Sequence, residues 1–248
     1  MDELWVAQLG LIDYRTALAR QEQLRDARRA GAIPDTMLVL EHPPVITRGR
    51  RSSADELPLG EAFFHARGID VVDVNRGGRL TYHGPGQLVG YPIVAVDDVV
   101  GHVRRLERAL VRALAETGIT ARARPEDGPD FTGVWVGEAK IASIGVHVAG
   151  RVTTHGFALN VANDMTPWTW FTPCGLATVA MTSVAEQLGE DAGCGEPLLR
   201  CLRQRIAHAV AETLGLRQRQ VTPERLDRAL KSSPGIGAEA TGATVPTR

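Results

Sequence analysis

Lysine is nearly absent from this 248-residue sequence, in which only Lys140 and Lys231 interrupt the use of arginine as the basic residue. Arginine stays protonated in proteins, whereas a buried lysine can change its pKa and exchange a proton. Lys140 lies in a glycine-punctuated apolar segment that is typical of a protein interior, whereas Lys231 precedes a tail rich in Ser, Gly and Pro. We therefore expect Lys140 to be a functional amine, the alternative being an ordinary solvent-facing loop cation.

Cysteine is also scarce, and the three residues Cys174, Cys194 and Cys201 show no CxxC spacing. This pattern argues against a disulfide framework and against a zinc site. No apolar run approaches roughly 18 residues, and no basic segment followed by an apolar one opens the chain, so the sequence predicts neither a membrane span nor a secretory signal. An odd number of cysteines without a signal favours a reducing compartment, and we expect a cytoplasmic protein.

Net charge is close to balanced, at −1 with a pI near 6.7, so nothing global indicates binding to nucleic acid or to an anionic membrane. The sequence contains neither the GxxxxGK[ST] phosphate loop nor a GxGxxG dinucleotide fingerprint between a strand and a helix. These absences argue against a nucleotide-dependent enzyme of the common motif classes.

Helical patterns lie at both ends of the chain, around a middle that is rich in short β-prone runs. The predicted helices cover residues 14–29, 61–67, 98–117, 183–188, 197–214 and 223–231. The predicted strands cover residues 36–41, 45–48, 69–74, 80–82, 88–96, 119–124 (at an edge), 133–136, 141–148 and 152–161. Because helices and strands do not alternate regularly, we predict an α+β fold with a mixed, mostly antiparallel central sheet flanked by helices. We expect residues 1–231 to form one domain and residues 232–248 a disordered tail.

The stretch from Arg76 to Gln87 (RGGRLTYHGPGQ) combines four glycines with many hydrogen-bonding side chains. Glycine lets the backbone approach a ligand closely, and Arg76 and Arg79 can hold a carbonyl or an anion. The stretch therefore indicates a ligand-binding wall, the alternative being a β-hairpin with a glycine-rich turn.

Two further segments carry small residues at positions where adjacent strands could leave room for a slender apolar ligand. The first includes Ser143 and Gly145, and the second includes Gly156 and Ala158. His155 lies beside the second segment, but a lone histidine at a strand turn is more often structural than catalytic.

Cys174 lies between Pro173 and Gly175 in a predicted loop, where a thiol can be reactive. A neighbouring ammonium favours the thiolate, which is the nucleophilic form. Once an acyl group on sulfur has removed the negative charge, a lysine at that position could deprotonate an incoming amine. Lys140 could fill both roles, whereas arginine could fill only the first. We expect Cys201 to be a buried, inert thiol and Cys194 an incidental one.

Four motifs in this order, RGGRLTYHGPGQLVGYPI, AKIASIGV, HGFALNV and PCGL, resemble the octanoyltransferases of lipoate synthesis, the lipoate-protein ligase B family. The resemblance covers roughly residues 13–188. It implies transfer of an octanoyl group from acyl carrier protein to a specific lysine of lipoyl domains. These domains belong to 2-oxo-acid dehydrogenase E2 subunits and to the glycine cleavage H protein. The implied fold is that of the biotin and lipoate ligases, which is related to class II synthetase cores.

The resemblance also implies roles for individual residues. Cys174 matches the acyl-thioester nucleophile, and Lys140 matches the lysine that favours its thiolate. The matched substrate-binding residues are Arg76, Gly77, Gly78, Arg79, Leu80, Thr81, Tyr82, His83, Ser143, Ile144, Gly145, Gly156, Phe157 and Ala158. Exchange between two thioesters is roughly isoenergetic and amide formation is downhill, so we expect no cofactor and no metal. We also expect a monomer that binds no nucleic acid and no membrane.

Two alternatives remain open at this point. An ATP-dependent lipoate or biotin ligase would share the fold but would need no nucleophilic cysteine, and a non-catalytic acyl-binding module would share only the pocket. A further hypothesis concerns the basic turn, where Arg48, Arg50 and Arg51 could help to dock an acidic carrier protein.

Overall fold

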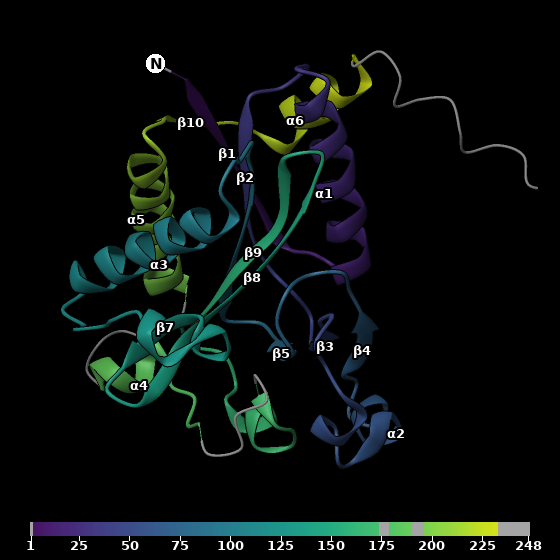
Figure 1. Cartoon of the computed structure of the whole chain (residues 1–248), viewed down its shortest axis with the longest axis vertical. Coiled ribbons are helices and arrows are strands. Elements are labelled where there is room, and N and C mark those ends of the chain that lie inside the picture. Colours follow the sequence, from purple (N-terminus) through teal and green to yellow (C-terminus); the bar gives the residue numbers. More distant parts are fainter. Residues whose placement is uncertain (1, 174–178, 190–195, 233–248) are drawn as a thin grey trace, which may run out of the picture.

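The computed structural model describes residues 2–173, 179–189 and 196–232 of the chain. Its centre is a seven-stranded sheet with helices on both faces (Figure 1). In spatial order the strands are β10 (Arg217–Gln220), β1 (Glu3–Leu11), β2 (Asp35–Glu41), β6 (Gln87–Ile93), β9 (Val152–Asn160), β8 (Ala139–Ala149) and β7 (Gly133–Val136). Only the pairs of β1 with β10 and with β2 are parallel. The predicted mixed, mostly antiparallel sheet is therefore confirmed.

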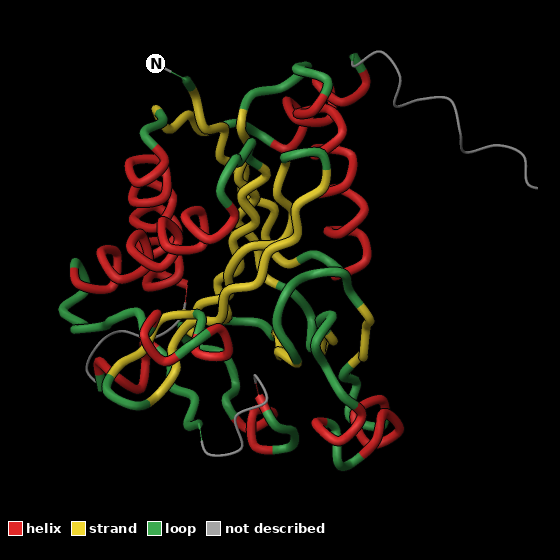
Figure 2. Tube along the Cα trace, in the orientation of Figure 1, coloured by secondary structure: helices red, strands yellow, loops and turns green. Residues whose placement is uncertain are grey.

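The two faces of this sheet are covered by different helices (Figure 2). One face packs against α1 (Tyr14–Arg29) and α6 (Pro223–Lys231), and the other packs against α3 (Val99–Ala115) and α5 (Glu196–Leu214). Side chains alternate between the faces along each strand. On β2, for example, Met37 and Val39 join the core under α3 and α5, whereas Leu38 and Leu40 join the core under α1.

A second, three-stranded sheet lies beside the first, in the order β4 (Asp70–Asp73), β3 (Val45–Arg48) and β5 (Leu80–His83). Its apolar side packs with α2 (Gly60–His65) and with the aromatic residues Trp168 and Phe171. The remaining short helices are α4 (Val184–Leu188) and the 3₁₀ turns Ala54–Glu56, Pro125–Asp127, Pro129–Phe131 and Thr166–Thr169.

Four helices begin at the polar residues that the sequence indicates as caps. The side chains of Asp13, Asp98, Ser183 and Thr222 each accept a hydrogen bond from a backbone amide in the first turn of the helix that follows. Such caps satisfy amides that have no partner inside the helix. The predicted boundaries at these four positions are therefore confirmed.

Three expectations about strands differ from the structure. Residues 119–124 form no edge strand, because only an isolated bridge joins Arg122 to Trp135. Strands β1 and β10 were not predicted. The alternative of a β-hairpin across the glycine-rich stretch is wrong, because β5 pairs with β3 in the small sheet whereas β6 pairs with β2 and β9 in the large one. The chain thus passes from one sheet to the other between His83 and Gln87.

No helix in the part of the chain that the structure describes is long and apolar enough to cross a bilayer. Cys174, Cys194 and the tail from residue 233 onward lie outside the described residues.

Candidate active site

A pocket lies between the small sheet and the β8–β9 face of the large sheet. Most of the residues that the sequence indicated as a site line it: Arg76, Gly78, Arg79, Leu80, Thr81, His83, Lys140, Ser143, Ile144, Gly145, Gly156, Phe157 and Ala158. Three segments that are far apart in the sequence therefore meet around a single pocket.

Three of the indicated residues are not among those that line the pocket. Cys174 lies outside the described residues. Tyr82 packs in the core of the small sheet, where its ring makes an edge contact with that of Trp168. Side chains alternate along β5, so Tyr82 points to the other side of the strand from Thr81 and His83. Gly77 crosses over β8, where its amide donates a 3.0 Å hydrogen bond to the carbonyl of Val146.

An irregular strand pairing explains why Lys140 faces the pocket. Residues Lys140 and Ser143 are three positions apart and would normally point to opposite faces of β8. The register between β7 and β8 shifts, so that Trp135 pairs with Lys140, Val134 pairs with Ala142, and Ile141 is left without a partner. One extra residue in a strand reverses the alternation that follows it. Lys140 and Ser143 thereby reach the same face.

The side chain of Lys140 is buried, with only 1% of the residue exposed, so the alternative of a solvent-facing loop cation is wrong. Its Nζ lies 5.4 Å from the centroid of the Trp135 ring, a favourable position for a cation. A Cβ atom on Gly133 would lie 2.6 Å from Cε of Lys140. Glycine at position 133 therefore gives the lysine side chain its path along the sheet.

The backbone of Lys140 is paired with the segment that follows the undescribed residues 174–178. Its amide donates to the carbonyl of Ala180 (2.8 Å), and its carbonyl accepts from the amide of Thr182 (3.0 Å). On the other side of the gap, the amide of Thr172 donates to the carbonyl of Glu56 (3.0 Å). The chain is thus anchored shortly before and shortly after the segment that contains Cys174.

Aromatic and histidine side chains form a cluster on the pocket wall, in which only His83 was predicted as a site residue. Tyr14, Tyr91 and His155 line it together with His83. The rings of Tyr14 and His83 are stacked with centroids 5.9 Å apart, and Tyr91 meets His155 edge-on. Its members come from α1, β5, β6 and β9, and only tertiary packing brings them together, so the local sequence could not indicate the cluster.

These buried groups are neutral at physiological pH. Burial lowers the pKa of His155 to about 3, with a further contribution from the charge of Arg76, and burial lowers the pKa of His83 well below its usual value. Burial likewise raises the pKa of Tyr14 to about 12. This cluster on the pocket wall therefore offers hydrogen-bonding groups without a net charge.

His155 adopts a left-handed backbone conformation, with φ of +58°, inside strand β9. A non-glycine residue in this region is strained, and such strain is concentrated at functional sites. Surrounding contacts hold it in place: its amide donates to Oε1 of Gln21 (2.6 Å), and its Nε2 lies 3.0 Å from Oδ1 of Asn75. His155, for which a structural role was the more common expectation, lies on the pocket wall.

The small residues on β8 and β9 face one another directly, Ser143 opposite Ala158 and Gly145 opposite Gly156. Glycine is needed here for the protein's own packing. A Cβ atom on Gly145 would lie 2.9 Å from the carbonyl oxygen of Gly77. A Cβ atom on Gly156 would collide with the carbonyl oxygen of Gly90. The glycines thus allow close backbone contacts at the pocket wall as well as space for a ligand.

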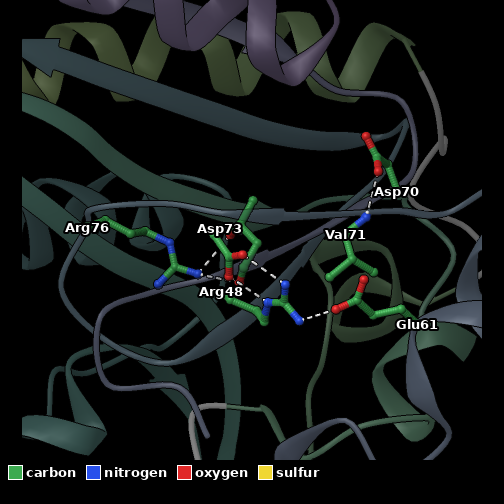
Figure 3. Close-up of polar contacts among 7 residues, drawn as sticks. Arg48, Glu61, Asp70, Val71, Asp73 and Arg76 are labelled. Atoms are coloured by element: carbon green, nitrogen blue, oxygen red, sulfur yellow. Dashed lines mark hydrogen bonds and ion pairs between the residues drawn. The ribbon is translucent and has the colours of Figure 1, made fainter. Parts of the chain in front are cut away.

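The two arginines of the glycine-rich stretch are engaged in structural contacts. Arg76, which is 7% exposed, donates to the carbonyl and hydroxyl oxygens of Thr47 at 2.9 and 2.8 Å (Figure 3). Arg79 donates to Oε1 of the buried Glu56 at 2.5 Å. These contacts hold the stretch against the small sheet. They use many of the hydrogen-bond donors of Arg76 and Arg79 that the sequence suggested for binding a ligand.

The basic turn also differs from the expectation of a free cationic surface. Arg48 is bound by Asp73 and Glu61 on either side (Figure 3), and Arg51 pairs with Asp130 at 3.0 Å. Paired charges attract a distant partner less strongly than isolated ones. Arg50 and Arg51 are both exposed. Of the three arginines, Arg50 alone has no ion pair among the described residues.

Among the described residues, no group of His, Cys, Asp and Glu has an arrangement that could hold a metal ion. The chemistry that these residues can support is that of a buried amine beside a slender pocket with glycine-rich walls.

Comparison with known proteins identifies the family. Residues 13–204 match the model of the lipoyl protein ligase A/B catalytic domain. The chain belongs to this family. An octanoyltransferase of Solibacter usitatus is 50% identical over 182 residues, which cover 72% of this chain and 80% of the relative. An octanoyltransferase of Mycobacterium ulcerans is 45% identical over 221 residues, which cover 84% and 87%. These relatives place the chain among the octanoyltransferases, which are acyltransferases, and the predicted resemblance is confirmed.

Solved structures of lipoate-protein ligases share the fold of this chain. A lipoate-protein ligase A bound with ATP superposes with a TM-score of 0.72 at 18% identity, over 92% of this chain and 93% of that one. The bipartite lipoate protein ligase of Thermoplasma acidophilum gives a TM-score of 0.73 at 18% identity, over 93% and 91%. At this level of identity the likeness establishes the fold alone.

Proposed function

We propose that this enzyme transfers an octanoyl group from octanoyl-acyl carrier protein to a specific lysine of lipoyl domains, through a thioester on Cys174. The acceptors are the lipoyl domains of 2-oxo-acid dehydrogenase E2 subunits and the glycine cleavage H protein. The enzyme works as a cytoplasmic monomer without a cofactor. The observation that carries the proposal is the buried Lys140 on the wall of a slender pocket, in a chain 44–50% identical to octanoyltransferases.

The pocket wall suits a saturated acyl chain. Phe157, Ile144 and Ala158 supply apolar surface, and the facing pair Gly145 and Gly156 adds little bulk. Pockets for small ligands combine such apolar walls with a few placed polar groups.

Chain connectivity supports a role for Cys174 together with Lys140. Cys174 precedes Ala180 by six residues, and the carbonyl of Ala180 accepts from the amide of Lys140. Six residues can span at most roughly 20 Å. Chain connectivity therefore keeps Cys174 within about 20 Å of Ala180, which pairs with the backbone of Lys140. This limit is compatible with the contact between thiol and amine that the proposed chemistry requires.

In the proposed mechanism the ammonium of Lys140 favours the thiolate of Cys174, which attacks the carbonyl carbon of the donor thioester. The donor leaves as a thiol, because its sulfur takes a proton from the ammonium of Lys140, and the octanoyl group remains on the sulfur of Cys174. The amine of the lipoyl domain then attacks this second thioester. Lys140, which no longer faces a negative charge, accepts the proton that the amine loses, and the thiolate of Cys174 leaves.

An ATP-dependent lipoate ligase is the second candidate, because a ligase bound with ATP shares the fold. Such an enzyme activates the acid as an adenylate and has no use for a cysteine–lysine pair. The identity of 44–50% to octanoyltransferases, compared with 18% to the ligase, favours the transferase.

Incubation with octanoyl-acyl carrier protein in the absence of ATP, followed by intact-mass measurement, tests the proposal. We expect a single octanoyl adduct that hydroxylamine removes, and transfer of the group to a lipoyl domain. Cys174→Ala should form no adduct and transfer nothing, whereas the control Cys201→Ala, on α5, should behave as the wild type. Transfer that requires ATP and free octanoate, or substantial transfer by Cys174→Ala, would overturn the proposal.

A further inference from the structure

Two buried hydroxyl groups on the pocket wall have no hydrogen-bond partner. The side-chain oxygens of Thr81 and Ser143 are buried, and neither one makes a hydrogen bond within the described part of the chain. Both residues line the pocket. Native proteins rarely leave buried polar groups unpaired, because the lost hydrogen bond to water is not replaced. An unpaired hydroxyl on a residue that lines a pocket is therefore expected to find its partner in the ligand.

The two hydroxyls come from opposite walls of the pocket. Thr81 lies on β5 of the small sheet, is 6% exposed, and lies on the same side of the strand as His83. Ser143 lies on β8 of the large sheet, directly opposite Ala158. The pocket therefore carries one such hydroxyl on each of these two walls.

Ser143 lies beside the amine of Lys140. Its partner across the sheet is Gly133, and a Cβ atom on Gly133 would be 3.4 Å from Nζ of Lys140. Ser143 is therefore on the part of the pocket wall that carries the amine of the proposed chemistry.

We infer that the hydroxyls of Thr81 and Ser143 donate hydrogen bonds to the carbonyl oxygen of the octanoyl thioester. The inference rests on the proposed function. A saturated acyl chain carries its only strong hydrogen-bond acceptor at the carbonyl, and a hydroxyl can donate to it. Of the other polar side chains that line the pocket, Arg76 donates to Thr47, and His83 lies 2.7 Å from Gln87.

The two hydrogen bonds would act on the step in which charge develops. As the thiolate sulfur bonds to the carbonyl carbon, the electron pair of the C=O π bond moves to oxygen, and both hydroxyls stabilise the resulting oxyanion. When the pair returns, the bond to the donor sulfur breaks, and the donor leaves as a thiol with the proton that Lys140 gives up. Hydrogen-bond donors held at the position of such an oxyanion are among the largest contributions to catalysis.

The test replaces each hydroxyl and measures single-turnover formation of the octanoyl adduct by rapid quench and intact mass. Thr81→Val and Ser143→Ala should each lower the rate constant at saturating donor by about 10²-fold, with the half-saturating donor concentration little changed. Thr81→Ser keeps the hydroxyl and should retain most of the rate.

Thermal unfolding supplies a second readout that a structural role would move in the opposite direction. Thr81→Val and Ser143→Ala should leave the Tm unchanged or raise it, because each removes an unpaired buried group. The matched control is Thr153→Val on β9, whose hydroxyl donates to the carbonyl of Pro92 (2.7 Å) and accepts from the amide of Val94 (2.9 Å). The control should unfold at a lower temperature but form the adduct at the wild-type rate.

Adduct formation at the wild-type rate in both Thr81→Val and Ser143→Ala would overturn the inference. An equal loss in Thr81→Ser and Thr81→Val would also overturn it, because the hydroxyl would then be irrelevant. If the wild-type protein itself forms no adduct, the proposed function fails and this inference fails with it. The three results are distinguishable in the same experiment.

Discussion

Lys140 is a residue for which the choice between lysine and arginine has chemical consequences. Its side chain is buried beside the Trp135 ring and next to the pocket, in a chain that uses arginine at almost every other basic position. A guanidinium at this position could attract a thiolate as well as an ammonium does. It could not accept a proton near neutral pH, because arginine stays protonated in proteins.

Lys140→Arg should therefore affect the two half-reactions unequally. We expect formation of the octanoyl adduct to slow modestly and transfer to the lipoyl-domain amine to slow by about 10²-fold or more, the range of general base catalysis. Single-turnover measurements of each step, beginning with donor or with isolated adduct, give the two rates. The control Lys231→Arg, in the last turn of α6, should leave both rates unchanged. Equal slowing of the two steps by Lys140→Arg would contradict the two-role mechanism.

At the scale of elements, a chain of buried hydrogen bonds connects the pocket with the strand segment beside Lys140. Oε1 of Gln87 lies 2.7 Å from Nδ1 of His83, and Nε2 of Gln87 donates to Oδ1 of Asn160 at 3.0 Å. Nδ2 of Asn160 then donates to the carbonyl of Thr182 at 3.0 Å, and the amide of Thr182 donates to Lys140. Asn160 thus joins β6 and β9 to the segment that pairs with Lys140, as a positioning residue.

Asn160→Leu should slow adduct formation about tenfold or more and change its pH profile, because the pairing beside Lys140 is loosened. The substitution also leaves buried polar partners unsatisfied, at a cost of about 1–3 kcal/mol. Rates measured between pH 6 and 9 report the protonation of the reacting pair. The control Val210→Ala, in the core under α5, lowers stability without touching this network and should keep the wild-type pH profile. An Asn160→Leu profile that superposes on the control would show that Asn160 has only a structural role.

The sequence predicted those elements whose signals are local. The helices capped by Asp13, Asp98 and Thr222 begin where the sequence indicated, because a cap acts within one turn. Strand β10 (RQRQ) carries no apolar pattern and forms only because its backbone pairs with β1, more than two hundred residues earlier. Such long-range pairing leaves no trace in the local sequence, which is also why residues 119–124 were wrongly predicted as a strand.

The same distinction applies to the candidate site. Ordered motifs indicated most of the residues that line the pocket, because glycines and polar side chains are concentrated in short segments. The shift in register at Ile141, which turns Lys140 towards Ser143, depends on pairing with β7 and could not be predicted. The contribution of Tyr14 and Tyr91 depends on how α1 and β6 pack, and the ion pairs of Arg48 depend on partners from α2 and β4.

At the scale of the whole molecule, histidines buried without charge link stability to pH. Burial lowers the pKa of His42 and His102 to about 4 and that of His155 to about 3, whereas the usual value is 6.5. The unfolded chain therefore binds more protons than the folded one below about pH 6.5. Their contribution to stability is complete above that pH and is lost as the pH falls towards the lowered values. Acid should thus unfold the protein partly through these histidines.

His102 allows this linkage to be tested away from the pocket. It is fully buried on α3, and neither ring nitrogen has a hydrogen-bond partner among the described residues. A pKa lowered from 6.5 to about 4 corresponds to about 3 kcal/mol of stability lost between those pH values. His102→Leu should remove that loss, so that its free energy of unfolding falls less steeply with acid than that of the wild type.

Urea unfolding at pH 7.5, 6.5, 5.5 and 4.5 measures the effect as a difference between two curves, so the carboxylates that titrate in the same range cancel. The control His208→Gln replaces a histidine on α5 whose side chain is 59% exposed and should keep the wild-type slope. A His102→Leu curve parallel to that of the wild type would mean that the folded protein admits the proton at His102 without loss. The acid sensitivity would then have to arise from the histidines around the pocket, and octanoyl-adduct formation would be lost over the same pH range as the fold.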